Sequence, residues 1–469
     1  MFHSTRGKEE VSASEALLNG LAKDGGLYVW DQFPKLDYKE FLEYDYPMLA
    51  AKILSLYLDE ISLSDLQLEV KKAYQSFTCP TVVDLKKVND SYFLELFHGP
   101  TLAFKDLALV VLPRLMKLAK NKIGFKDTIT ILTATSGDTG GAALNGFKDV
   151  EGVSIAVLYP NQGVSFIQEA QMCSFRSKNA EMFAVEGNFD DCQNAVKQFF
   201  SEHKDLCLSS ANSMNIGRLL PQIVYYFYSY IQLVKSKDIK EGEAVNFVVP
   251  TGNFGNIFAG FCAKQMGLPI GNLICASNKN DVLTEFFNTG IYNRMRAFYK
   301  TNSPSMDILI SSNLERLLYY ALDQDTAKVA ELMEALKEKG KFTFMNPFSF
   351  IKAYHLDERE TISQIQMLYQ DTNYLMDPHT AVAYGAYQKY KKEYGDTKKT
   401  IIVSTASPFK FPQVMAEAFH LKKENILQQL SSMTGLSIPS VLNYPPIERK
   451  VIRLEDAEKK MLEVIKCFM

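Results

Sequence analysis

The sequence predicts an α/β protein in which parallel sheets are wrapped by helices. From residue 128 onward, short β-rich runs alternate with amphipathic segments of helical period, and glycine-rich turns follow several of these runs. Strands that alternate with helices at this spacing form parallel sheets with helices on both faces. The strand-like runs are 128–133, 153–158, 182–185, 245–249, 272–276 and 400–403. Because such folds bind ligands at the carboxyl ends of strands, we expect functional residues in the turns that follow.

Two regions depart from this alternation, and the length of 469 residues exceeds one typical domain. The first region is mostly helical and precedes the first glycine-rich turn of the sheet pattern. The second consists of helices and loops inside the later α/β part. We therefore expect a mostly helical N-terminal region at 1–95, a smaller α/β domain at 96–210, and a large α/β domain at 211–469 with an insertion at 281–350. These boundaries are approximate because the units interleave.

Composition excludes several classes of protein. Hydrophobic residues make up 47% of the chain, charged residues 22%, and the net charge is −3 with both signs interspersed, so we expect no nucleic-acid partner. No apolar run is long enough for a membrane span, and the N-terminus lacks a secretory signal. Seven cysteines without a CxxC pair indicate reduced thiols in a cytoplasmic protein. The motifs HExxH, GxxxxGK[ST] and GxSxG are absent, so we expect no metal and no P-loop.

The segment 95–112, ELFHGPTLAFKDLALVVL, carries the most information. Pro100 ends a strand-like stretch, and a helix is predicted from about Phe104. Residues 107–112 are apolar on all sides, so this helix should be buried. Lys105 lies at its N-terminal end, where burial disfavours the ammonium form and provides a nucleophilic amine. A lone lysine at a helix start is more often a side chain that extends to solvent, so its position alone does not decide its role.

Three glycine- or hydroxyl-rich turns follow predicted strands. The first, PTGNFGN at 250–256, lets the backbone approach a ligand and offers the N–H groups of a helix start to a phosphate. The second, TSGDTG at 135–140, suits a carboxylate, or it is a capping turn that uses Ser136 or Asp138 as the N-cap. The third, STASP at 404–408, is by itself only a turn at a strand end. Each motif alone is weak, since such turns often only redirect the chain.

Taken together, the lysine segment is similar to the lysine signature of the serine/threonine dehydratase family of pyridoxal-phosphate enzymes, through Glu95, Thr101 and the run 103–109. The resemblance implies fold type II, the fold of the tryptophan synthase β chain. It also implies that Lys105 forms the Schiff base with pyridoxal 5'-phosphate. In this family the glycine loop binds the cofactor phosphate, which here assigns that role to Gly252, Asn253, Phe254, Gly255 and Asn256.

The same resemblance assigns roles to the other two turns. Thr135, Ser136 and Thr139 would bind the carboxylate of an amino-acid substrate, and Asp138 would lie near the phenolic oxygen of the cofactor. The Thr405 hydroxyl would bond the pyridine nitrogen. A neutral hydroxyl does not force that nitrogen to stay protonated, so the ring is a milder electron sink, which favours elimination and replacement reactions.

Further motifs narrow the resemblance to the threonine synthase family. They are Ser4–Gly7, Asp24–Val29, Phe97–Thr101, Ser213–Arg218 and Ser303–Ile308, and they extend over essentially the whole chain. The length and the segment 281–350 match the long bacterial and fungal form of the family. The late motif departs from the pattern, because Ser407 stands where many relatives have histidine. The local role of Ser407 therefore stays open.

This family resemblance implies a γ-elimination of phosphate from O-phospho-L-homoserine followed by β-addition of water, which gives L-threonine. Lys105 would remove the Cα proton. The departing phosphate needs an anion pocket separate from the cofactor loop. Arg218 is the first candidate because its fork binds phosphate with two hydrogen bonds, unless it forms a surface ion pair. Lys410 is the second, with Ser136 or Asn215 assisting.

The expected partner is a small-molecule substrate, without nucleic acid or membrane, and the protein is expected to be a monomer or homodimer. Two other functions stay open: a threonine or serine dehydratase-like lyase, and a catalytically silent homologue that binds pyridoxal phosphate. His98, in a Gly-Pro turn, is a secondary candidate for acid–base chemistry. His379 is expected to cap a helix start near the site without taking part in the chemistry.

Overall fold

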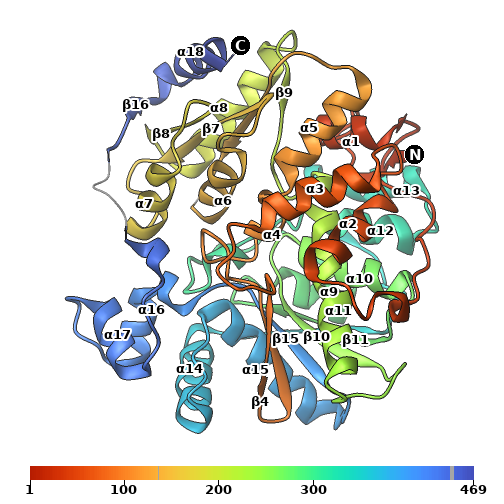
Figure 1. Cartoon of the computed structure of the whole chain (residues 1–469), viewed down its shortest axis with the longest axis vertical. Helices are drawn as coiled ribbons and strands as arrows, with labels where there is room; N and C mark the ends of the chain where they lie inside the picture. The colour runs from red at the N-terminus through yellow and green to blue at the C-terminus, as the bar shows by residue number, and fades with distance from the viewer. Residues whose placement is uncertain (136, 444–447, 469) are drawn as a thin grey trace.

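Two sheets flanked by helices make up most of the structure (Figure 1), a computed structural model that describes residues 1–135, 137–443 and 448–468. In spatial order, the six-stranded sheet contains β14 (Ile351–His355), β11 (Ile270–Ser277), β10 (Val245–Pro250), β15 (Thr400–Ser404), β5 (Ser91–Glu95) and β4 (Asp84–Val88). The five-stranded sheet contains β16 (Val451–Arg453), β8 (Ala180–Glu186), β7 (Val153–Pro160), β6 (Ile129–Ala134) and β9 (Leu208–Ser209). All pairs are parallel except β4–β5, so the predicted α/β class is confirmed.

The inner strands β5, β10 and β15 of the six-stranded sheet are buried on both faces, which explains their largely apolar sequences. In β10, Phe247 and Val249 point into one core, and Val248 points into the core on the opposite face. The helices around this sheet are α9 (Ile216–Lys235), α10 (Gly255–Gln265), α11 (Val282–Thr289), α14 (Glu358–Thr372), α15 (Pro378–Tyr394), α16 (Pro412–Phe419) and α17 (Ile426–Thr434). Helix α15 packs along β10, β11 and β15, and α10 lies on the opposite side.

The five-stranded sheet has the same two-sided construction. Ile131 and Ile155 belong to the main core, whereas Leu132 and Leu158 belong to a separate core on the other face. The helices around it are α5 (Leu112–Ile123), α6 (Asp138–Phe147), α7 (Phe166–Ser174), α8 (Phe189–Glu202) and α18 (Ala457–Phe468). Figure 1 shows α18 beside this sheet at the top of the molecule, close to α8.

The N-terminal region contains three helices and a small antiparallel sheet. The helices are α1 (Ala13–Asn19), α2 (Tyr46–Ser55) and α3 (Leu63–Tyr74), and the strands are β1 (Phe2–Ser4), β2 (Glu10–Val11) and β3 (Tyr28–Val29). Strand β1 pairs with both β2 and β3. The first residues of the chain therefore lie beside β3, which follows the turn at Gly25. The region therefore combines helices with a short sheet that the sequence did not predict.

The segment 281–350 forms no part of either large sheet. It contains α11, the antiparallel pair β12 (Ile291–Asn293) and β13 (Lys341–Thr343), a short 3₁₀ turn η2 (Pro304–Met306), and helices α12 (Leu314–Ala321) and α13 (Thr326–Lys339). Within the described ranges, no helix combines the length and apolar character that a bilayer crossing requires.

The strand order of the two sheets can be compared with the expected domains. It does not define the domain boundaries, which stay a proposal. Strand β5 belongs to the six-stranded sheet, although it directly precedes the segment with Lys105. Strand β16 pairs with β8, and Ile452 and Met461 are buried against the five-stranded sheet. Residues 451–468 therefore pack with the unit expected at 96–210, although the expected boundaries assign them to the unit at 211–469.

Candidate active site

Three neighbouring strands deliver the candidate residues to one edge of the six-stranded sheet. Strands β10, β15 and β5 are parallel neighbours, so their carboxyl ends, at Pro250, Ser404 and Glu95, lie at the same edge. The loop 251–254 follows the first strand, Thr405 follows the second, and the segment that leads to Lys105 follows the third. The backbone N–H of Phe104 donates to the Thr405 carbonyl at 2.8 Å, which joins the last two segments directly.

Lys105 lies immediately before a single helical turn, α4 (Asp106–Leu109), which is buried as predicted. The predicted continuous helix is interrupted, because α5 begins only at Leu112. The Lys105 side chain is 14% exposed, and its Nζ lies 3.1 Å from Ser305 Oγ and 3.7 Å from Asp138 Oδ2. Burial lowers the Lys105 pKa to about 8. The carboxylate of Asp138 opposes this shift in part, whereas the positive charges of Lys410 and Arg218 add to it. The amine is therefore available as a nucleophile or base near neutral pH.

Asp138, the first residue of α6, is the anionic centre of this cluster. Its Oδ2 accepts from the Ser305 hydroxyl at 2.8 Å, and its Oδ1 accepts from Gln168 Nε2 at 2.9 Å and pairs with Lys410 Nζ at 2.9 Å. Burial alone raises the pKa of the Asp138 carboxyl, but Lys410 and Lys105 reverse this effect and hold the pKa well below its ordinary value. Asp138 is therefore ionised and holds the two lysines together.

Lys410 is almost fully enclosed, with 3% of its surface exposed. Besides Asp138, its Nζ donates to the Thr101 carbonyl at 2.7 Å. It is the last residue of the turn η3 (Pro408–Lys410), which begins three residues after Thr405. The structure thus brings Lys105, Asp138, Thr405 and Lys410 into one region. A small pocket is lined by Lys105, Asp138, Thr405, Ser305 and His379, together with residues 103, 104 and 406.

The loop 252–256 has the geometry of a phosphate cradle. Phe254 adopts a left-handed conformation, with φ of 63°, and α10 begins at the next residue without any side chain capping its first N–H groups. A Cβ at Gly252 would lie 2.8 Å from the Ser305 carbonyl oxygen, so only glycine fits there. The amide oxygen of Asn256 accepts from the hydroxyls of Tyr225 and Tyr226. Its Nδ2 is buried and has no partner among the described residues, which leaves a donor for an anion.

The turn at 135–140 is organised by Thr135. Its hydroxyl oxygen accepts from the backbone N–H groups of Gly137 at 3.0 Å and Gly140 at 2.9 Å. The alternative in which Asp138 caps α6 is wrong, because Gly137 is the N-cap residue and the Asp138 carboxylate faces the lysines instead. Thr139 follows in the first turn of α6, and Ser136 lies outside the described residues. The hydroxyl of Thr135 therefore shapes the loop.

Arg218 lies in the first turn of α9 and is 4% exposed, so the alternative of a surface ion pair is wrong. Its Nη1 donates to the Ala211 carbonyl at 2.7 Å, and its buried Nε has no partner among the described residues. Burial lowers the Arg218 pKa to about 10, which leaves the guanidinium charged. Asn215 caps α9 through Gly217 N–H, and its Nδ2 donates to the Leu17 carbonyl. Asn215 therefore holds the helix start that carries Arg218.

Two site residues, Ser305 and Gln168, were not assigned from the sequence. His379 was expected to cap a helix start, but Asp377 is the N-cap of α15. Ser305 contacts both Lys105 and Asp138, Gln168 orients Asp138, and His379 Nε2 accepts from the Ser305 backbone N–H at 3.2 Å. Asp377 caps α15 and binds His379 Nδ1 at 2.8 Å, so the imidazole is held in place beside the site. Ser305 lies in one of the family motifs quoted above, and that motif was the only available signal. His98 pairs with Glu95 at 3.1 Å and does not line the pocket.

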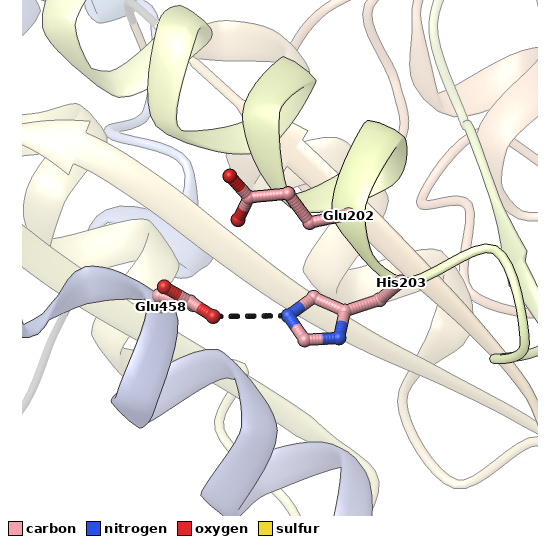
Figure 2. Close-up of side chains that lie close together, drawn as sticks. All are labelled: Glu202, His203 and Glu458. Atoms are coloured by element: carbon pink, nitrogen blue, oxygen red, sulfur yellow. Dashed lines mark hydrogen bonds and ion pairs between the residues drawn. The ribbon is translucent and has the colours of Figure 1, made fainter.

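A separate group of side chains has the composition of a metal site. Glu202, His203 and Glu458 each place one ligand atom within 4.8 Å of the others, on α8 and α18 (Figure 2). His203 Nε2 already lies 3.1 Å from Glu458 Oε1, and both carboxylates are exposed. The contact between His203 and Glu458 attaches α18 to the end of α8, which explains why these side chains lie close together. We assign no metal to it, and the expected absence of a metal cofactor stays a prediction.

The residues of the pocket fit pyridoxal phosphate. A lysine with a lowered pKa, an uncapped helix start with a glycine that no larger residue can replace, and a threonine hydroxyl meet at one sheet edge. The fold and this site define a pyridoxal-phosphate-dependent enzyme of fold type II. In agreement, the family model described as "Pyridoxal-phosphate dependent enzyme" matches residues 78–406.

Two further family models are more specific. "Threonine synthase N terminus" matches residues 1–74, and "Threonine synthase, C-terminal" matches residues 380–439. The chain belongs to the threonine synthase family. It is 39% identical to the threonine synthase of Schizosaccharomyces pombe, over 88% of each chain.

Solved structures agree over the full length. A pyridoxal-phosphate-bound threonine synthase from Brucella melitensis is 37% identical, with a TM-score of 0.89 over 99% of each chain. A yeast threonine synthase is 34% identical, with a TM-score of 0.90 over 99% of this chain and 98% of that chain. The first structure supports the cofactor that the sequence motifs indicated, and both match this chain over nearly its full length.

Proposed function

We propose that this protein is a carbon–oxygen lyase acting on phosphates, which converts O-phospho-L-homoserine and water into L-threonine and inorganic phosphate. This reaction is the last step of threonine biosynthesis. The observation that carries the proposal is the buried guanidinium of Arg218, which has no carboxylate partner in the described part of the chain. Its charge helps to lower the Lys105 pKa, so it acts on the same site as the lysine. A buried guanidinium with an unpartnered donor and no carboxylate gains stability when an anionic group binds to it, so Arg218 is suited to an anionic substrate group.

The cofactor is held by the three features at the sheet edge. Lys105 would carry it covalently, and the residues Gly252, Asn253, Phe254, Gly255 and Asn256 would bind its phosphate. Thr405 would bond its ring nitrogen, and Asp138 would interact with its phenolic oxygen. When bound, the cofactor supplies an electron sink that stabilises negative charge at the substrate Cα.

The protein's own groups perform the proton transfers and the anion binding. The loop with Thr135, Ser136 and Thr139 binds the substrate carboxylate, and the Lys105 amine takes the Cα proton. A pKa near 8 leaves about a tenth of this amine neutral at pH 7, enough for it to act as a general base. A proton then leaves Cβ, and phosphate leaves Cγ. Cγ takes up a proton to become the methyl group, water adds its hydroxyl at Cβ, and a proton returns to Cα.

Arg218 and Lys410 bind the departing phosphate. Arg218 donates through its unpartnered Nε, and Lys410 lies on the other side of Asp138 from Lys105. Asn215 acts by holding the first turn of α9, because both ends of its amide are already bonded inside the protein. Each hydrogen bond from a charged donor to the phosphate contributes about 1.5–3 kcal/mol.

The remaining properties follow from this activity. The partner is a small molecule, with neither nucleic acid nor membrane, and we propose a monomer or homodimer. A cytoplasmic location fits the seven cysteines, all of which are free in the structure.

The test is amino-acid analysis of the holoenzyme incubated with O-phospho-L-homoserine, with phosphate release measured in parallel. Equal amounts of threonine and phosphate support the proposal. Phosphate with 2-oxobutyrate and little threonine identifies a dehydratase-like lyase instead. Neither product from a yellow, cofactor-loaded protein identifies a catalytically silent homologue.

Arg218→Met tests the second anion pocket. The expected result is a KM for the phosphorylated substrate raised by about tenfold or more, since one charged hydrogen bond is lost. Arg176→Met is the matched control, because Arg176 pairs with Glu181 on the outer part of the five-stranded sheet. A dehydratase-like enzyme has no phosphate to bind, so unchanged kinetics in Arg218→Met would falsify this assignment.

A further inference from the structure

Arg316, in α12, is a charged side chain with no exposed surface. Burial lowers its pKa to about 10, so the guanidinium is still protonated at neutral pH. None of its hydrogen bonds reaches a carboxylate: Nε donates to the Tyr28 carbonyl at 3.0 Å, Nη2 to the Met214 carbonyl at 2.6 Å, and Nη1 to Asn313 Oδ1. The neighbouring carboxylate of Glu315 is bound by Arg6 instead. A buried cation paired only with neutral oxygens is costly, so its retention needs an explanation.

The contact with Asn313 reaches the loop proposed to bind the cofactor phosphate. Since Asn313 Oδ1 accepts from Arg316, its Nδ2 faces away and donates to the Asn253 carbonyl at 2.9 Å. The backbone N–H of Asn313 donates to the same carbonyl at 3.0 Å. In a trans peptide the C=O and the next N–H point in opposite directions. Holding the Asn253 carbonyl therefore turns the N–H of Phe254 toward the other side of the loop.

The contact with Met214 reaches the turn that carries Arg218. Met214 directly precedes Asn215, the N-cap of α9. Arg218 donates to the Ala211 carbonyl of the same turn. Two guanidinium groups thus bind carbonyls at both ends of the segment 211–214. The bond from Arg316 therefore adds an anchor at Met214 to those that Asn215 makes with Leu17 and Gly217, and the position of Arg218 depends on them together.

The third contact, to Tyr28, connects both loops to the N-terminal sheet. Tyr28 lies in β3, and the adjacent Glu315 accepts from Arg6 at 2.8 and 2.7 Å and from the Thr5 hydroxyl. The start of α12 therefore joins three segments that are distant in sequence. Thr5 also offers a control, because it stabilises the N-terminal sheet and has no hydrogen bond to either loop.

We propose that Arg316 is a positioning residue for both phosphate sites. It orients the loop 252–256 through Asn313 and the Arg218 turn through Met214, and its charge adds to the positive potential of both sites. This inference rests on the proposed function, which assigns a phosphate to each site. The two bound phosphates would in turn offset the buried charge of Arg316, which explains why the protein keeps a cation there.

The test compares four variants of the full chain: Arg316→Met, Arg316→Lys, Asn313→Ala and Thr5→Val. Two affinities are measured: that of apoprotein for pyridoxal phosphate, by absorbance, and that of the holoenzyme for inorganic phosphate, by calorimetry. Arg316→Met should weaken both by about tenfold, the size expected for a lost charged hydrogen bond. Arg316→Lys keeps the charge, but its ammonium group cannot reach three acceptors in a plane. Both of its affinities should therefore lie between those of the wild type and of Arg316→Met.

The other two variants separate positioning from general stability. Asn313→Ala should weaken cofactor binding and leave phosphate binding within about twofold, because Asn313 connects Arg316 to the loop at Asn253 and has no hydrogen bond to the turn that carries Arg218. Thr5→Val lowers the melting temperature but should leave both affinities within about twofold. Should Arg316→Met fail to fold, Arg316→Lys and Asn313→Ala still decide the question.

Wild-type affinities in Arg316→Met, or equal losses in Arg316→Met and Thr5→Val, overturn the inference. The proposed function can fail separately. If the wild-type protein forms no threonine while Arg316→Met and Asn313→Ala both lose cofactor affinity, the substrate is wrong and the positioning of the cofactor loop stands. If threonine forms and the affinities of the variants are unchanged, only the inference about Arg316 is wrong.

Discussion

Replacing Asp138 by asparagine removes the carboxylate that faces both Lys105 and Lys410, at 3.7 and 2.9 Å. With the Lys105 pKa at about 8, about a tenth of the amine is neutral at pH 7. An opposite charge at this distance changes a pKa by about one to three units. Since Asp138 stabilises the ammonium form, its loss should lower the Lys105 pKa by that amount. At least about half of the amine is then neutral at pH 7, and its rate of acylation rises about fivefold.

The assay is competitive acetylation of the apoprotein at a series of pH values, with modification of Lys105 measured by mass spectrometry. Wild-type protein should reach half-maximal reactivity near pH 8, well below the value of about 10.4 for an ordinary lysine. The variant also leaves Lys410 without its carboxylate, which costs about 3–5 kcal/mol of stability, so its folding is checked first. Asp106→Asn is the control, because the Asp106 carboxylate accepts from Thr101 and does not contact Lys105. A wild-type midpoint near pH 10, or a higher midpoint in Asp138→Asn, refutes the electrostatic reasoning.

Three further predictions concern the same site. Lys105→Met should abolish both the yellow colour of the reconstituted protein and threonine formation; colour retained in the absorption spectrum places the cofactor on another lysine. Because the Lys105 pKa is about 8 in the folded protein and about 10.4 in the unfolded chain, the unfolded chain holds this proton more tightly, so apoprotein stability should rise by about 3 kcal/mol from pH 8 to 10.4. Unfolding measured across this range should show the rise in wild type and not in Lys105→Met. Gly252→Ala places a Cβ 2.8 Å from the Ser305 carbonyl and should weaken cofactor binding by about 1–3 kcal/mol in an absorbance titration, whereas Gly141→Ala, whose Cβ meets only ordinary contacts, should not.

The central strands were predictable because of where they lie. Strands β6, β7, β10 and β15 are buried on both faces, so their sequences are continuous apolar runs that end at glycine- or hydroxyl-rich turns. Strands β14 and β16 lie at sheet edges and mix polar with apolar residues. Residues 451–453 are flanked by charged residues, and only the pairing with β8 makes them a strand. Such a pairing depends on contacts distant in sequence, which local patterns do not contain.

The same distinction applies to the candidate site. Lys105, the loop 252–256 and Thr405 each lie in a local motif next to a strand, so the sequence indicated them. Ser305 contacts Lys105 from 200 residues away, in a segment without sheet periodicity. Arg316 has no motif at all. Its importance follows from its burial and from three hydrogen bonds to distant segments, which only the folded chain brings together.

The balance of buried charge connects the fold to the choice of substrate. Lys105, Lys410, Arg218 and Arg316 are enclosed around the two loops, and Asp138 is the carboxylate that pairs with the two lysines. A substrate with a neutral side chain would leave the guanidinium of Arg218 without a counter-charge, at a cost of several kcal/mol per ion. In the proposed assignment, a phosphorylated substrate neutralises it, and the released phosphate keeps it neutral until product leaves. We therefore expect the burial that makes Arg218 unfavourable in the free protein to favour the phosphorylated amino acid over its unphosphorylated counterpart, which is the discrimination that would separate this reaction from that of a dehydratase.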